Sequence, residues 1–140
     1  MSAAAARDAC AGATVTVVES ASGSLSGAAE TLGTNPGIRT VRSRVEAFLE
    51  TGDDGDAPAA PDIVVLDPPR GGAGIPVMKA LATAARSRIV HVGCDPASLA
   101  RDVGVLVAEG WVLRDLRGVA AFPGTHHVEG IAVLDAPARS

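Results

Sequence analysis

The segment DIVVLDPPRGG, residues 62–72, constrains the fold more than any other part of the chain. Its four consecutive apolar residues, IVVL, are typical of a strand that is buried on both faces. Asp67 comes next, followed by Pro68 and Pro69, which cannot donate hydrogen bonds to a neighbouring strand. The sequence therefore predicts a buried strand and a stiff turn that carries Asp67. This turn is either a rigid wall beside a pocket or an ordinary strand end with a solvated acid.

Strand and helix patterns alternate along the chain, which predicts an α/β fold with an open, mostly parallel sheet. A chain of 140 residues is the size of one domain. Asp95 and Pro96 are typical of a helix start, and Gly110 is typical of a helix end. The expected strands lie in 13–19, the start of 37–50, the start of 62–72, 88–92, 111–116 and 128–135, and the expected helices lie in 23–37, the end of 37–50, 75–86 and 95–109.

The charge and hydropathy of the chain bear on the kinds of partner and location that it can have. Net charge is −4 and no long basic run is present, so charge alone does not indicate tight binding to a nucleic-acid backbone. No apolar run is long enough to span a membrane, and the start of the chain lacks the pattern of a signal peptide. We therefore expect a cytoplasmic protein with no membrane partner. Cys10 and Cys94 are expected to be free thiols there.

Polar residues gather where the predicted strands end. In an open α/β sheet, ligands bind beyond the carboxyl ends of the strands, and the sequence places Glu19, Asp67, Cys94 and the segment 122–129 at such ends or beside them. A carboxylate at the position of Glu19 commonly accepts the hydroxyls of a ribose. The alternative is an ordinary acid that faces water.

Cys94 is the candidate nucleophile. It lies just before a helix that Asp95 is expected to cap, and the positive end of the helix dipole favours a thiolate. The negative charge of Asp95 acts in the opposite direction. A buried, inert cysteine is the alternative, although the junction between strand and helix favours the nucleophile.

The segment FPGTHHVE, residues 122–129, combines two histidines with an acid. Neighbouring His126 and His127 point to opposite faces of an extended chain, so they make a poor metal site, and no metal is expected. Glu129 is either a general base, if it faces the same cleft as Cys94, or a solvated acid at a strand start.

Three blocks together resemble a known family. DIVVLDPPRGGAG, HVGCDPASLARDV and FPGTHHVEGIAVL are similar to the catalytic half of the RNA uracil-5-methyltransferases, which form 5-methyluridine in transfer and ribosomal RNA with S-adenosylmethionine. The match covers about residues 13–135 and is strongest from residue 62 onward. The resemblance implies a Rossmann-like class I methyltransferase fold, with helices on both faces of the sheet, and RNA as the partner.

The resemblance also implies roles for single residues. Cys94 would be the nucleophile that adds to C6 of uracil, and Glu129 would be the base that removes the proton from C5. Asp67 would lie in the pocket for cofactor and base, and Glu19 would bind the adenosine ribose. Thiolate addition at C6 moves negative charge to C5, which can then accept a methyl group.

Departures from the family pattern predict an incomplete protein. Residues 1–140 are expected to be a partial catalytic domain that lacks the RNA-binding module, the first sheet strand and its Gly-rich loop. A missing strand would leave an exposed sheet edge, through which the chain could associate with itself. Ala120 replaces a usual aspartate and His91 a usual tyrosine. We therefore expect little or no activity from the isolated chain.

Two alternatives remain open at this point. One is an amino-methyltransferase, because a Asp-Pro-Pro turn also suits an exocyclic amine; it predicts that Cys94→Ser leaves activity intact. The other is a non-catalytic remnant or interaction module that uses the exposed sheet edge.

Overall fold

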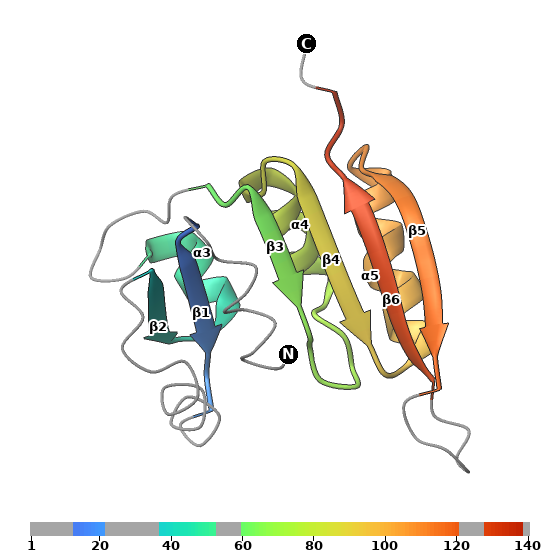
Figure 1. Ribbon diagram of the computed structural model, residues 1–140, viewed down its shortest axis with the longest axis horizontal. Coiled ribbons are helices and arrows are strands. Elements are labelled where there is room, and N and C mark those ends of the chain that lie inside the picture. Colours follow the sequence, from blue (N-terminus) through green and yellow to red (C-terminus); the bar gives the residue numbers. More distant parts are fainter. Residues whose placement is uncertain (1–12, 22–36, 53–59, 121–127, 139–140) are drawn as a thin grey trace. The chain divides into compact units, whose positions relative to one another are not determined.

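The structure is a computed structural model that describes residues 13–21, 37–52, 60–120 and 128–138. It divides into two compact units, residues 1–58 and 59–140 (Figure 1). No helix of the described residues is long and apolar enough to cross a bilayer.

The N-terminal unit contains a pair of parallel strands and a short helix. Strand β1 (Val15–Glu19) pairs with β2 (Ile38–Arg42), and helix α3 (Val45–Thr51) follows. These elements confirm the predicted strand at 13–19 and the predicted strand and helical turn within 37–50. The helix expected over 23–37 lies almost wholly outside the described residues. Only Gly37 of this segment is described, and it lies in a turn.

The C-terminal unit contains a four-stranded sheet with the order β3-β4-β6-β5. Strands β3 and β4 are parallel, and β6 is antiparallel to both of its neighbours, so three of the four strands share one direction. The elements are β3 (Ile63–Leu66), α4 (Ile75–Ala84), β4 (Arg88–Gly93), α5 (Pro96–Ala108), β5 (Val112–Val119) and β6 (Glu129–Asp135). They confirm the predicted alternation of strand and helix, although β5 extends beyond the predicted 111–116.

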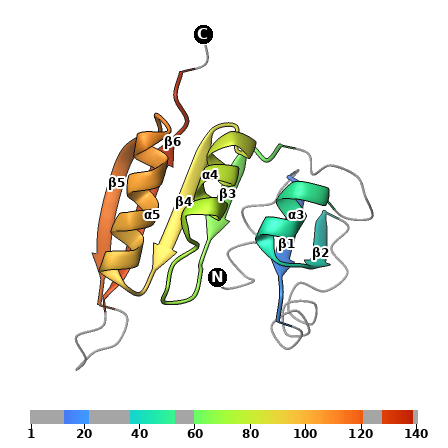
Figure 2. The ribbon, with the colours of Figure 1, turned by 180° about the vertical axis from the view of Figure 1, so that it is seen from behind.

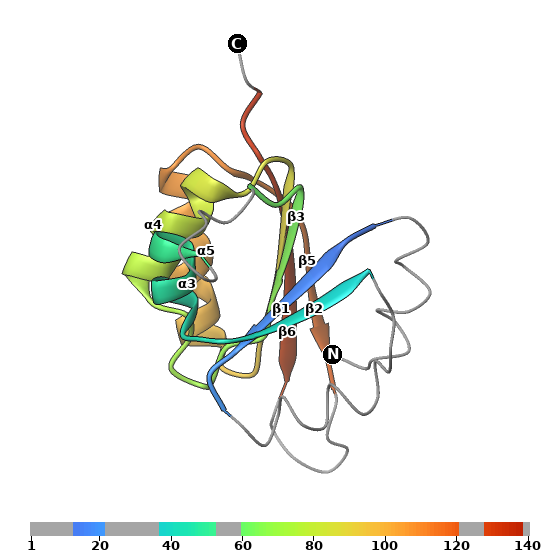
Figure 3. The same cartoon turned by 90° about the vertical axis from the view of Figure 1, so that its left-hand side faces the viewer.

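Helices α4 and α5 cover the same face of this sheet (Figures 2 and 3). A crossover between parallel strands is almost always right-handed, so two crossovers that advance in the same direction place their helices on one face. The expected helices on both faces are therefore not seen for this sheet within the described residues. Val90 and Val92 alternate with buried residues of β4 and lie half-buried on the other face.

The core of the C-terminal unit lies between the sheet and its two helices. Trp111 is buried after α5, and its Nε1 donates to the carbonyl of Ala82 at 3.3 Å. The other apolar side chains that are fully buried include Met78, Ile89, Leu106 and Leu134. Aliphatic side chains from both helices and two strands thus replace the aromatic residues that the sequence lacks.

Candidate active site

Asp67 is the first residue after β3, and its side chain is exposed. The two prolines that follow fix the backbone dihedral φ and prevent the strand from continuing. The amide of Gly72 donates to the carbonyl of Pro69 at 2.7 Å and closes a tight turn. Asp67 is therefore held on a short, stiff segment at the carboxyl end of β3, as the sequence predicts. The predicted burial of the strand itself is wrong within the described residues, since Ile63 and Val65 are 59% and 50% exposed.

Cys94 lies between β4 and α5 and is partly exposed. Asp95 is the N-cap of α5, because its side chain accepts a hydrogen bond from the amide of Ser98 at 2.8 Å. The predicted cap is thus confirmed. The thiol is not sealed in the interior, so a substrate can in principle approach it.

Glu129 begins β6 at the rim of the sheet where β4 ends. In the antiparallel ladder Gly93 lies opposite Gly130, where the pairing of β4 with β6 ends. Cys94 follows Gly93 in the chain, and Glu129 precedes Gly130. Because β3 runs parallel to β4, Asp67 leaves the sheet at this same rim. The rim therefore gathers an acid, a thiol and a second acid.

A row of glycines lies one step inside this rim. Gly93, Gly130 and Gly118 are opposite one another on three neighbouring strands. A Cβ atom on Gly130 would clash with the side chain of Leu99, and one on Gly93 would lie 3.2 Å from Leu99 Cβ. Gly93 and Gly130 thus allow the first turns of α5 to pack closely on the sheet, one residue away from Cys94 and Glu129 in the sequence.

The carboxylate of Asp95, next to Cys94, interacts with other groups. The hydrogen bond from the Ser98 amide lowers the pKa of Asp95, and the positive charge of Arg70 contributes in the same direction. The carboxylate is therefore directed to the helix cap and to a cation. The lower pKa keeps this carboxylate charged beside Cys94.

Glu19 belongs to the N-terminal unit and is described apart from the other three residues. It is the last residue of β1 and is partly exposed, and its Oε1 accepts a hydrogen bond from the amide of Ala21 at 2.8 Å. Its Oε2 has no hydrogen-bond partner among the described residues.

The two histidines of the third sequence block, His126 and His127, lie outside the described residues, as does the Phe122–Pro123 pair. Within the described ranges, no three histidine, cysteine or acidic side chains lie close enough to hold a metal ion.

Asp102 is the functional candidate that the sequence reasoning missed. Its side chain is fully buried, and its Oδ2 lies 3.1 Å from Nε2 of His91, which is also buried. The signal was present in the helix pattern: Leu99, Asp102 and Leu106 follow the spacing of one buried helix face. An acid on such a face requires several hydrogen-bond partners.

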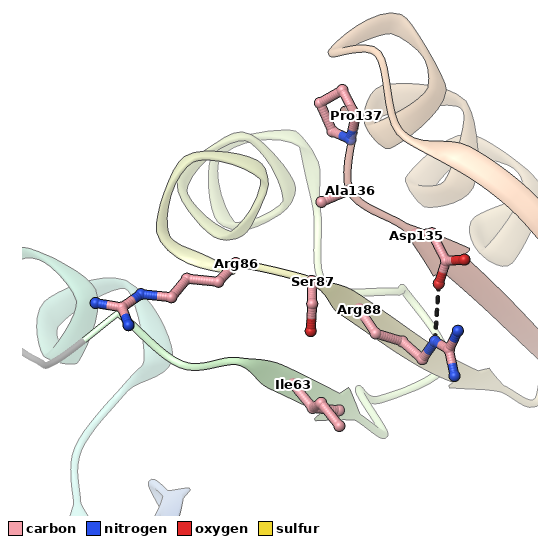
Figure 4. Close-up of a pocket in the computed structure, with 7 residues that line it drawn as sticks. All are labelled: Ile63, Arg86, Ser87, Arg88, Asp135, Ala136 and Pro137. Carbon is pink, nitrogen blue, oxygen red and sulfur yellow. Dashed lines mark hydrogen bonds and ion pairs between the residues drawn. The ribbon is translucent and has the colours of Figure 1, made fainter. Parts of the chain in front are cut away.

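A hollow among the described residues lies away from this rim. It is lined by Ile63, Arg86, Ser87, Arg88, Asp135, Ala136 and Pro137 (Figure 4). Ile63 and Arg88 begin their strands and Asp135 ends β6, so the hollow lies at the opposite rim. Arg88 Nε donates to Asp135 there at 2.8 Å, and the side chain of Arg86 points away from this pair.

Comparison with known proteins finds RNA methyltransferases among the relatives of this chain. No protein-family model matches the chain. An uncharacterized RNA methyltransferase of Bifidobacterium longum is 49% identical over 76 residues, which make up 54% of this chain and 18% of the relative. The chain spans roughly a fifth of the length of the curated relatives it matches.

Solved structures give the fold. The tRNA (uracil-54, C5)-methyltransferase of Pyrococcus abyssi, in complex with S-adenosyl-L-homocysteine, superposes with a TM-score of 0.68 and 27% identity over 86% of this chain and 28% of that chain. The fold is that of the class I methyltransferases. The N-methyltransferase NodS of Bradyrhizobium japonicum has the same fold, with a TM-score of 0.69 at 10% identity over 89% of this chain and 74% of that chain.

Proposed function

We propose that this chain carries the catalytic centre of an RNA methyltransferase that transfers a methyl group from S-adenosylmethionine to C5 of uracil in ribosomal or transfer RNA. The observation that supports the proposal is that Cys94 follows β4 and Glu129 begins β6, two paired strands, at the rim where Asp67 follows the parallel strand β3. The identity to RNA methyltransferases and the likeness to a uracil-C5 enzyme support it.

Glu19 would bind the ribose of the cofactor's adenosine. One oxygen of this carboxylate orders the backbone after β1, and the other has no partner among the described residues, so it can accept ribose hydroxyls. Asp67, exposed on its stiff turn, would hold the cofactor or the base. When bound, S-adenosylmethionine supplies the methyl group on a positively charged sulfur.

Cys94 activates the base in this proposal. Its thiolate forms a bond to C6 of uracil, and the electron pair of the C5–C6 double bond moves to C5 and the neighbouring carbonyl. C5 then becomes nucleophilic enough to accept the methyl group. Cys94 lies just before the N-terminus of α5 and is partly exposed.

Glu129 completes the reaction as a general base. It removes the proton from C5, the electron pair restores the double bond, and the bond from C6 to Cys94 breaks, which returns the thiolate. In this proposal the carboxylate reaches the atom next to the one that the thiol attacks. A uracil in a helix must first leave its stack to enter such a site.

The expectations about turnover, location and self-association stay predictions. We expect weak or no turnover from this chain alone. A cytoplasmic location and self-association through a sheet edge also stay predictions.

Covalent trapping under single-turnover conditions tests the proposed function. RNA that contains 5-fluorouridine is mixed with an equal amount of protein and S-adenosylmethionine. Because a fluorine at C5 cannot leave as a proton does, the adduct with Cys94 persists and is seen as a shifted band on a denaturing gel. We expect the band to require S-adenosylmethionine and to disappear in Cys94→Ser.

Glu129→Gln is the matched variant. It should still form the adduct, and with ordinary RNA it should accumulate the adduct that the native protein resolves. Methyl transfer that survives Cys94→Ser would indicate an amino-methyltransferase and overturn the proposal. The absence of any adduct with a native chain that binds both S-adenosylmethionine and the RNA would overturn it as well.

A further inference from the structure

Asp102 anchors the loop that carries Asp67. The loop joins β3 to α4, and its backbone is attached to α5 at several points. The amides of Ala73 and Gly74 donate to the two carboxylate oxygens of Asp102 at 2.6 and 3.3 Å. Arg101 Nη2 donates to the carbonyl of Gly71 at 2.8 Å.

The carboxylate of Asp102 is saturated with donors although it is fully buried. Besides the two loop amides, it receives hydrogen bonds from Nε and Nη2 of Arg101 at 3.1 and 2.7 Å and lies 3.1 Å from Nε2 of His91. Burial alone raises the pKa of Asp102, but the hydrogen bonds from Arg101, His91 and Ala73 outweigh it, and the net pKa lies below the ordinary value.

Stability alone does not explain an acid at this position. A leucine would continue the apolar face that Leu99 and Leu106 form, and apolar residues often replace buried ion pairs without loss of stability. A leucine, however, cannot accept hydrogen bonds from the amides of Ala73 and Gly74. The specific property of Asp102 is therefore the connection between α5 and the loop.

A continuous stiff path leads from Asp102 to Asp67. The anchored residues Ala73 and Gly74 follow Gly72, whose amide is bonded to Pro69. Gly72 has φ +78°, and a Cβ atom there would lie 2.6 Å from Asp102 Oδ2, so the loop must pass this close to the carboxylate. Pro68 and Pro69 then fix φ up to the residue next to Asp67.

We propose that Asp102 is a positioning residue, which acts through this path to hold the Asp67 carboxylate in place at the rim shared with Cys94. The role in binding rests on the proposed function, because Asp67 is there assigned to the pocket for cofactor and base. His91 contributes from β4, where it lies opposite Leu66, the residue just before Asp67. Strand, loop and helix therefore meet at one buried carboxylate.

Hydrogen exchange and ligand binding test this inference. Asp102→Asn keeps the size of the side chain but removes its charge and one acceptor. We expect the amides of Ala73 and Gly74 to exchange about tenfold faster or more. Binding of S-adenosylhomocysteine, measured by calorimetry on the folded protein, should weaken by about tenfold, because a small misplacement of a binding group has effects of that size.

Leu106→Ala is the matched control. It removes a fully buried side chain from the same face of α5, one turn away, and touches none of the loop hydrogen bonds. It should lower thermal stability but leave the exchange of Ala73 and Gly74 and the ligand affinity near their native values. Equal losses in both variants would show a purely structural role and overturn the inference.

A double-mutant cycle identifies the path. If Asp102 acts through Asp67, the Asp67→Asn and Asp102→Asn double variant should bind no more weakly than Asp67→Asn alone. Additive losses would overturn the inference, as would unchanged amide exchange in Asp102→Asn. If the native chain does not bind S-adenosylhomocysteine at all, the proposed cofactor fails, whereas the exchange of Ala73 and Gly74 still decides whether Asp102 anchors the loop.

Discussion

Gly130 of β6 lies directly opposite Gly93 of β4, and the side chain of Leu99 occupies the space that both glycines leave. Glu129 directly precedes Gly130 in the sequence, and Cys94 directly follows Gly93. The depth at which α5 packs on the sheet is therefore set immediately beside the candidate nucleophile and base. This relationship makes the glycines part of the site geometry without any contact with a substrate.

Gly130→Ala should destabilise the protein by about 1–3 kcal/mol, since the new methyl group would overlap with Leu99 in a packed core. The double variant with Leu99→Ala should be more stable than the sum of the two single effects, because the shorter side chain removes the overlap. Urea unfolding measures all three free energies. Strict additivity would show that Leu99 does not pack on Gly130.

Gly104→Ala should have the opposite sign. Gly104 lies in the interior of α5, and nothing lies within 4 Å of where its Cβ would be. Alanine loses less backbone entropy in a helix, so we expect a gain of about 0.5–1 kcal/mol in the same unfolding experiment. A loss of stability would mean that this face of α5 is covered.

Asp95→Asn and Asp95→Ala should separate the cap of α5 from the charge beside Cys94. Asparagine also caps helices well, whereas alanine is expected to cost about 1 kcal/mol of stability. Asn removes a negative charge next to the thiol, so iodoacetamide should alkylate Cys94 faster at neutral pH. The measurement uses a Cys10→Ser background, and equal alkylation rates in the native and Asn proteins would contradict the expectation.

The stability of the protein should fall at acid pH, and Asp102 should contribute to the fall. The pKa of Asp102 is lower in the folded chain than the ordinary value of about 3.9. As pH falls below about 4, the unfolded chain binds a proton that the folded chain does not, so the free energy of unfolding decreases by up to about 1.4 kcal/mol per pH unit for each such group. Asp102→Asn should flatten this profile, measured by urea unfolding at a series of pH values.

Asp135 provides a contrast to Asp102. Hydrogen bonds from Arg88 and Arg114 lower its pKa, but both arginines are largely exposed, with 49% and 59% of their side-chain surfaces accessible. Exposed ion pairs contribute about 0–1 kcal/mol and weaken with salt. Asp135→Asn should therefore cost less than about 1 kcal/mol, whereas loss of the buried Asp102 charge should cost several times more. Unfolding free energies of both variants at low and high salt decide this.

The sequence located most elements of the C-terminal unit because their signals are local. Asp-Pro-Pro ends a strand through the missing amide hydrogens, and Asp95 caps a helix through a hydrogen bond three residues along the chain. The length of β5 and its change of register between Leu113 and Asp115 were not predicted, since they depend on pairing with β6. The helices on a single face of the four-stranded sheet were not predicted either.

The amino-acid sequence by itself determined the order of strands and helices, the stiff turn that bears Asp67, and the helix start that follows Cys94, because each depends on residues a few positions apart. Only the tertiary structure decided which side chains meet. The pairing of β4, which Cys94 follows, with β6, which Glu129 begins, joins segments far apart in the chain, and the loop amides that donate to Asp102 are 28 and 29 residues away. An acid on an apolar helix face indicates that it needs hydrogen-bond partners, but only the packing shows which groups donate to it.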